Sequence, residues 1–179
     1  MSGTETAPEI NVALGDITVE RMDAIVNAAN CSLLGGGGVD GAIHRAGGPA
    51  ILEACRKLNG CATGDAKITT GGNLPAKYVI HTVGPVYRDG KHGEPDLLTS
   101  CYRRSLEVAL ENGIETVAFP AISCGVYGYP HAEAARIAIT TVKAFISKHP
   151  GVHLVRFVLF NRDIYEVFRK ALEQANASF

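Results

Sequence analysis

The chain has 179 residues, of which 46% are hydrophobic and 20% are charged, a balance typical of one globular domain. Its 17 basic and 18 acidic residues are dispersed and give a net charge of -1, which argues against the basic surface of a nucleic-acid partner. No run approaches the roughly 18 apolar residues that a membrane span requires, so no membrane partner is expected.

The five cysteines are an odd number and form no CxxC pair. No secretory leader precedes them, so reduced thiols and a cytoplasmic protein are expected. Cys55 and Cys61 match no zinc-ligand spacing and are expected to be buried thiols. Residues 1–8 are small, polar and proline-containing, which predicts a flexible N-terminus. Residues 9–179 are then expected to form a single domain.

Strand and helix patterns alternate along the chain. Apolar alternation and short β-branched runs predict strands at 9–14, 24–29, 66–70, 77–83, 115–120 and 153–160. Helical spacing predicts helices at 39–44, 49–58, 94–111, 131–148 and 163–174. Strands separated by helices favour an α/β fold: a three-layer α/β/α sandwich with a mixed, mostly parallel central sheet.

Chemistry-bearing segments follow four of these strands. Gly15-Asp16 follows the first strand, Asn30 the second and the loop 121–130 the fifth, and Phe160 ends the last. Ligands of parallel sheets bind beyond the carboxyl ends of the strands. The four segments are therefore expected to meet at one rim.

The stretch SLLGGGGVDGAIH, residues 32–44, contains four consecutive glycines directly before a predicted helix. Glycine lets backbone N–H groups approach an anion closely, and a helix N-terminus favours phosphate. The glycine-rich segment 123–128 precedes another predicted helix in the same way, and two such loops indicate a diphosphate. The lysine of a P-loop is missing, which disfavours nucleoside triphosphates. A dinucleotide such as NAD is also disfavoured.

Individual side chains near these loops leave alternatives open. Asp40 is either a reactive carboxylate or an acid that merely favours the first turn of its helix, and His44, on the same helical face, either supports it or packs. Asn30 is placed to hydrogen-bond a sugar hydroxyl, whereas Asn27 is better interpreted as a turn-former. His81, inside an apolar run, is expected to be a satisfied histidine of the sheet.

The roles of two aromatic residues, Tyr127 and Phe160, also have two interpretations each. Tyr127 is either a surface aromatic or a platform beside a ribose, because it stands in a glycine-rich loop. Phe160 is either a core residue or a contact for a ligand at the rim.

The motifs GDIT, IVNAAN, SLLGGGGVDGAIH, YVIHTVGP and FPAISCGVYGYP, in this order, resemble the macro domain family, specifically its MacroD-type branch. The resemblance extends over about residues 9–174 and implies an ADP-ribose pocket. Asp16 would hydrogen-bond the adenine amino group, the Ile17 backbone would seat the ring, and Phe160 would lie against the base. Asn161 stands where many relatives carry an acid.

The same resemblance implies that both glycine-rich loops hold the diphosphate and the distal ribose. Asn30 would contact that ribose, Asp40 would orient or deprotonate a water, and His44 would support Asp40. No metal or other cofactor is implied. The substrate-binding residues it implies are Asp16, Ile17, Asn30, Gly37, Gly38, Val39, Ser123, Cys124, Gly125, Val126, Tyr127 and Phe160.

Members of this branch remove acyl groups from O-acetyl-ADP-ribose and mono-ADP-ribose from acidic side chains of proteins, so ADP-ribose, its esters and modified proteins are the expected partners. The alternative is a non-catalytic ADP-ribose reader; a regulator acting through protein or RNA contacts has little sequence support. Val39-Asp40-Gly41 stands where the poly(ADP-ribose) glycohydrolase type has paired glutamates. Cys31 and His44 are too few for the zinc-containing type.

Overall fold

The computed structural model describes residues 7–177, which form one six-stranded sheet in the order β1-β6-β5-β2-β4-β3. All neighbouring strands are parallel except β3, which is antiparallel to β4. The expected mixed, mostly parallel sheet is confirmed. Of the predicted flexible N-terminus, residues 1–6 lie outside the described residues. The strands are β1 Glu9–Leu14, β2 Ala24–Ala29, β3 Ala66–Thr70, β4 Tyr78–Val83, β5 Thr116–Phe119 and β6 Leu154–Leu159.

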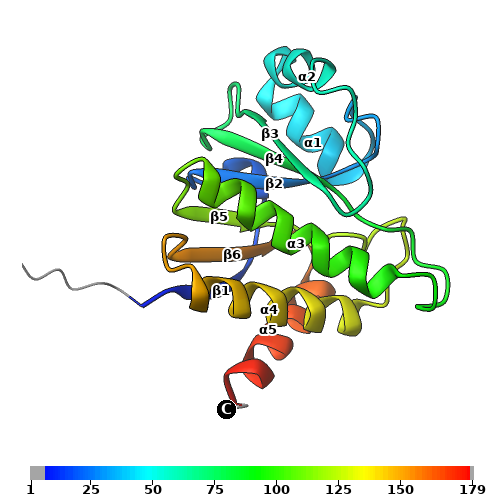
Figure 1. The fold of residues 1–179 in the computed structure, drawn as a ribbon, viewed down its shortest axis with the longest axis vertical. Coiled ribbons are helices and arrows are strands. Elements are labelled where there is room, and N and C mark those ends of the chain that lie inside the picture. The colour runs from blue at the N-terminus through cyan, green and yellow to red at the C-terminus, as the bar shows by residue number, and fades with distance from the viewer. Residues whose placement is uncertain (1–6, 178–179) are drawn as a thin grey trace, which may run out of the picture.

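Helices cover both faces of this sheet (Figure 1). The larger of the two hydrophobic cores lies between the sheet and α3, α4 and α5. On the other face, α1 and α2 cover the β2-β4-β3 end of the sheet. The predicted α3 and α4 are confirmed residue for residue, whereas α1 continues to Gly47 because the chain leaves the helix only at Gly48, whose φ is 80°. The helices are α1 Gly38–Gly47, α2 Pro49–Arg56, α3 Glu94–Glu111, α4 His131–Lys148 and α5 Arg162–Ala177, and a short 3₁₀ turn covers Ile17–Val19.

The core under α3, α4 and α5 is built around aromatic rings. Phe157 of β6 lies at its centre, with ring centroids 5.7 Å from Phe119, 6.1 Å from Tyr102 and 5.5 Å from Phe168. All four side chains are buried. Aromatic pairs at such separations stabilise a core beyond the area they bury, so this cluster fixes the strands whose ends carry the loops described below.

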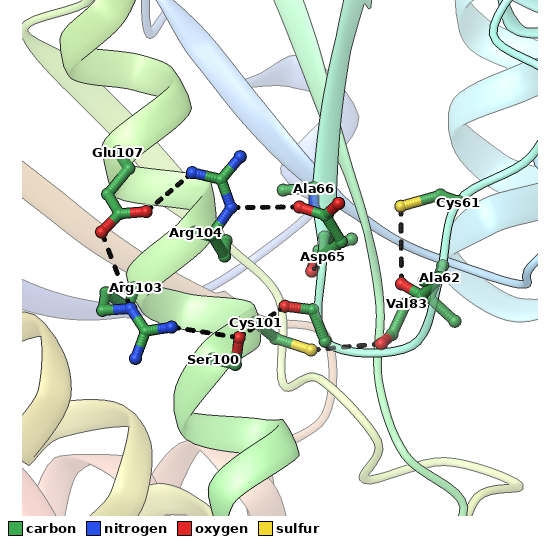
Figure 2. A network of polar contacts seen from close by, with 12 residues as sticks. Cys61, Ala62, Asp65, Ala66, Val83, Ser100, Cys101, Arg103, Arg104 and Glu107 are labelled. Atoms are coloured by element: carbon green, nitrogen blue, oxygen red, sulfur yellow. Dashed lines mark hydrogen bonds and ion pairs between the residues drawn. The ribbon is translucent and has the colours of Figure 1, made fainter.

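Polar contacts fasten α3 to β3 and β4 (Figure 2). The thiol of Cys101 donates to the carbonyl of Val83 over 3.2 Å, and the Arg104 guanidinium donates to Asp65 over 3.0 Å. Burial raises the pKa of Cys101 to about 11, so this thiol keeps its proton and stays a donor. The carboxyl end of β4 is thereby held in place. Cys61, also drawn there, and Cys55 are both buried with free thiols, as predicted.

The loop between β4 and α3 closes around one buried carboxylate, that of Glu94. Its two oxygens accept the backbone N–H groups of Arg88, Asp89, Gly90 and His92 over 2.6–3.2 Å. Desolvation acts to raise its pKa, but the N–H donors outweigh it and lower the pKa from 4.5 to about 2.

Substituting Glu94 by glutamine is expected to lower the thermal midpoint at neutral pH. The folded pKa of Glu94 is depressed, so its contribution to stability is present above about pH 4.5 and lost as the pH falls toward about 2. Thermal denaturation across that window should show a steep acid-induced loss of stability in the wild type and a shallower one in Glu94→Gln. The exposed neighbour Asp96, in the same helical turn, is the matched control as Asp96→Asn.

None of the helices within residues 7–177 is both long and apolar enough to cross a membrane.

Candidate functional site

A cavity of about 990 Å³ opens at the carboxyl edge of the sheet, and we call it the cleft. All five parallel strands contribute the residues that follow their ends: Asp16 after β1, Asn30 after β2, Gly84 after β4, Ala121 after β5 and Phe160 after β6. The expected convergence of four segments is confirmed, and β4 adds a fifth. This is the position that the topology of parallel sheets favours for a ligand.

The glycine tract forms the wall of the cleft above α1. Gly37 is the N-cap of that helix, and Gly38 takes a φ of 58°, a conformation that favours glycine. The amide of Asn30 holds the tract, because its nitrogen donates to the carbonyl of Gly35 over 2.9 Å and its oxygen accepts the hydroxyl of Ser32 over 2.6 Å. Asn30 thus shapes the glycine loop besides lining the cleft.

Asp40 lies in the first turn of α1, where the helix dipole favours a negative charge. Only 5% of it is exposed, yet it lines the cleft. Its Oδ1 accepts the side-chain N–H of Asn27 over 2.9 Å, and Nε2 of His44 stands 3.3 Å away without hydrogen-bond geometry. Its Oδ2 lies 3.1 Å from where a Cβ on Gly36 would be, so the glycine leaves that oxygen room.

The interpretation of Asn27 as a turn-former is wrong. Asn27 lies within β2, fully buried, and pairs in register with His81 of β4. Asn27 is the single polar side chain of β2, and His81 lies opposite it within the largely apolar β4, a pattern that indicates a buried polar pair. His81 is the satisfied sheet histidine that was predicted, since its ring nitrogens lie 3.1 Å from the Asn27 amide nitrogen and 2.8 Å from the Thr69 hydroxyl.

The loop after β5 forms the opposite wall of the cleft. Ser123 is held at a φ of 65° and donates its hydroxyl to the carbonyl of Pro85 over 2.8 Å. His131 lies 3.0 Å from the carbonyl of Cys124, which accepts the Nε2 proton. Burial raises the pKa of Cys124 to about 12, so its thiol stays protonated. The backbone N–H of Tyr87 donates to the carbonyl of Tyr127 over 2.9 Å.

The end of the cleft near β1 and β6 carries an acid and an exposed ring. Asp16 accepts the backbone N–H of Thr18 over 2.9 Å and its hydroxyl over 2.7 Å, which leaves its second carboxylate oxygen without a partner among these bonds. Phe160 is 84% exposed, so the interpretation of it as a core residue is wrong. The side chain of Asn161 accepts the N–H of Ile164 over 3.0 Å and so caps the start of α5.

Every residue predicted to bind substrate lines the cleft, as does Asp40. His44 does not line it and lies behind Asp40. The sequence interpretation missed Gly84, which directly follows β4, and His131 at the start of α4. The GP dipeptide after YVIHTV, at a strand end, was the signal for Gly84.

The side chains that could bind a metal ion lie together outside the cleft. Within the described part of the chain, one group of metal-ligand side chains gathers its ligand atoms within 4.8 Å: Asp89, His92 and Glu94. None of the three lines the cleft, and both oxygens of Glu94 already accept backbone N–H groups.

Comparison with known proteins identifies the family to which the chain is similar. Residues 26–138 match the family model of the Macro domain. The chain is 54% identical over 169 residues to the O-acetyl-ADP-ribose deacetylase of Escherichia fergusonii, covering 92% of this chain and 96% of that protein. It is 52% identical over 170 residues to the human ADP-ribose glycohydrolase MACROD2, covering 93% of this chain and 40% of that protein.

Among solved structures, the Oceanobacillus iheyensis macrodomain with ADP superposes with a TM-score of 0.93 at 41% identity, over 100% of this chain and 97% of that chain. The fold, the order of the motifs and these likenesses agree. The chain belongs to the macro domain family.

Proposed function

We propose that the protein is a hydrolase that binds ADP-ribose in the cleft, deacetylates O-acetyl-ADP-ribose and removes mono-ADP-ribose from acidic side chains of proteins. The two substrates share one chemistry, an ester on the distal ribose. The names of the relatives from Escherichia fergusonii and human support a hydrolase acting on ADP-ribose derivatives.

The ligand would lie along the cleft with its adenine at the Asp16 end. The free oxygen of Asp16 would accept the adenine amino group, the Ile17 backbone would seat the ring, and Phe160 would cover its face. Stacking of a base on an aromatic ring is favourable for every base, and the exposed ring of Phe160 offers such a surface.

The diphosphate would lie between the two loops. Gly37, Gly38 and Val39 present backbone N–H groups at the N-terminus of α1 on one side, and the segment 123–127 offers its backbone on the other. The distal ribose would then reach Asn30 and Asp40.

The observation that carries the proposal is the placement of Asp40. One carboxylate oxygen is fixed by Asn27 and the other is left with room beneath Gly36 at the wall of the cleft. A carboxylate held in this way takes a proton from a water molecule as that water attacks the ester that is to be hydrolysed. The products are free ADP-ribose and acetate, or ADP-ribose and the unmodified carboxylate of a protein.

The deciding experiment gives the wild-type protein O-acetyl-ADP-ribose and, separately, a protein mono-ADP-ribosylated on glutamate, and measures release of ADP-ribose. Release from both substrates is the expected result. Calorimetry with ADP-ribose runs in parallel: tight binding without turnover of either ester would instead identify a reader. Release from only the acetyl ester would restrict the function to deacetylation.

Truncating Phe160 to alanine is expected to weaken ADP-ribose binding by about 5- to 150-fold, the equivalent of 1–3 kcal/mol of stacking. The thermal midpoint should stay unchanged, because the ring is already exposed. Calorimetry and thermal denaturation measure the two effects. Val86, an exposed apolar residue that does not line the cleft, is the control as Val86→Ala. Equal affinity of Phe160→Ala and wild type would remove Phe160 from the binding site.

A further inference from the structure

A chain of buried polar side chains runs across three strands and ends on Asp40. Thr69 of β3, His81 of β4 and Asn27 of β2 lie on the sheet face that α1 and α2 cover, and each is buried. Thr69 Oγ1 lies 2.8 Å from His81 Nε2, and His81 Nδ1 lies 3.1 Å from Asn27 Nδ2. The same Asn27 nitrogen donates to Asp40 Oδ1 over 2.9 Å.

Thr69 determines which atoms donate and which accept along this series of hydrogen bonds. The hydroxyl proton of Thr69 goes to the carbonyl of Thr70, 3.0 Å away, so Thr69 accepts from His81. Burial, and secondarily the neighbouring His44, lower the pKa of His81 to about 3, so its ring is neutral and carries one proton. That proton lies on Nε2, facing Thr69, with Cys55 Sγ 3.6 Å away, and Nδ1 is left as an acceptor.

The bare Nδ1 of His81 fixes the orientation of the Asn27 amide. Only the NH₂ group of Asn27 can donate to Nδ1, and its second N–H then faces Asp40 Oδ1. The opposite orientation would place the amide oxygen against the carboxylate and against the bare ring nitrogen. The Asn27 oxygen is accordingly turned away from both and has no hydrogen-bond partner among the described residues.

We propose that Asn27 is a positioning residue for Asp40, and that Thr69 and His81 set the orientation in which Asn27 works. By holding Oδ1, the hydrogen-bonded series leaves Oδ2, beside Gly36, as the oxygen that would meet the attacking water. This inference rests on the proposed function and deepens it. Thr69, His81 and Asn27 are uncharged and lie in the packed core, so solvent does not compete for their hydrogen bonds.

Removing the Asn27 amide is expected to affect turnover and not binding. In Asn27→Leu, kcat for deacetylation should fall by about 10- to 100-fold, since a small misplacement of a reacting group costs up to about 10²-fold. The KM and the affinity for ADP-ribose should stay within about twofold, because Asn27 does not line the cleft. In an Asp40→Ala background the same substitution should leave the residual rate unchanged, because its effect passes through Asp40.

Thr69 provides a test at a residue that makes no contact with Asp40. Thr69→Val is expected to lower kcat by several-fold, and Thr69→Ser, which keeps the hydroxyl, should restore it. The matched control is Thr82→Val, which removes another buried hydroxyl, bonded to the carbonyl of Asp65 over 2.7 Å and separate from the chain. Thr82→Val should lower the thermal midpoint but leave kcat unchanged.

Heteronuclear NMR of the His81 ring nitrogens and of the Asp40 side-chain carboxyl carbon tests the inference without any measurement of activity. The wild type should show neutral His81 protonated at Nε2, and Asn27→Leu should shift the Asp40 side-chain carboxyl resonance. A wild type that hydrolyses neither ester overturns the proposed function alone, and the NMR result then decides on Asn27. An unchanged kcat in Asn27→Leu, a loss of kcat in Thr82→Val equal to that in Thr69→Val, or His81 protonated at Nδ1 overturns the positioning role.

Discussion

Replacing Asp40 with asparagine is expected to lower kcat for deacetylation of O-acetyl-ADP-ribose by about 10²–10⁴-fold, the contribution of a positioned general base. Asparagine keeps the shape of the side chain and an oxygen that can accept the Asn27 N–H, so the fold around it should persist. What the variant loses is the ability to take a proton from water. Binding of ADP-ribose should remain, because the loops, not Asp40 alone, form the cleft.

Single-turnover kinetics with O-acetyl-ADP-ribose measure this effect, and calorimetry with ADP-ribose measures binding. Asp96→Asn is the matched control, because it removes the same charge from the first turn of another helix, α3, outside the cleft. Equal deacetylation by wild type and Asp40→Asn would rule out Asp40 as the base. A loss of binding as large as the loss of turnover would assign Asp40 to ligand binding.

Gly41→Ala is expected to disturb the site through the backbone. A methyl group on Gly41, which is buried in α1, would lie 2.5 Å from the carbonyl oxygen of Gly36. Alanine favours the helix by about 1 kcal/mol over glycine, but overpacking costs about 1–3 kcal/mol. The net expectation is a stability loss of about 1 kcal/mol and displacement of Gly36 from its place above Asp40.

Because Gly36 lies beside Oδ2 of Asp40, its displacement in Gly41→Ala is expected to lower turnover by at least about tenfold. Thermal denaturation and deacetylation kinetics measure the two effects. Gly37→Ala is the control for stability, since a Cβ there meets nothing within 4 Å and its φ of -94° suits any residue. A Gly41→Ala protein that is more stable than wild type and equally active would show that the glycine loop absorbs the methyl group.

Local periodicity was sufficient to predict most of the fold. The predicted strand bounds agree with the structure within one residue, and α3 and α4 agree throughout, because each element buries a face whose apolar spacing is written into its own residues. The order of the strands was beyond such reasoning. β6 and β5 lie between β1 and β2, and pairings between strands so far apart in the chain leave no local signal.

The candidate site, like the fold, was predictable from the sequence only in part. The sequence by itself determined the glycine loops, the position of Asp40 in the first turn of a helix, and the meeting of the loops at one edge, because glycine conformation, helix starts and parallel strand ends are local properties. Only the tertiary structure decided what Asn27 does. Its partners Asp40 and His81 stand 13 and 54 residues away along the chain, so its burial and the direction of its hydrogen bonds exist only once the sheet and α1 have packed together.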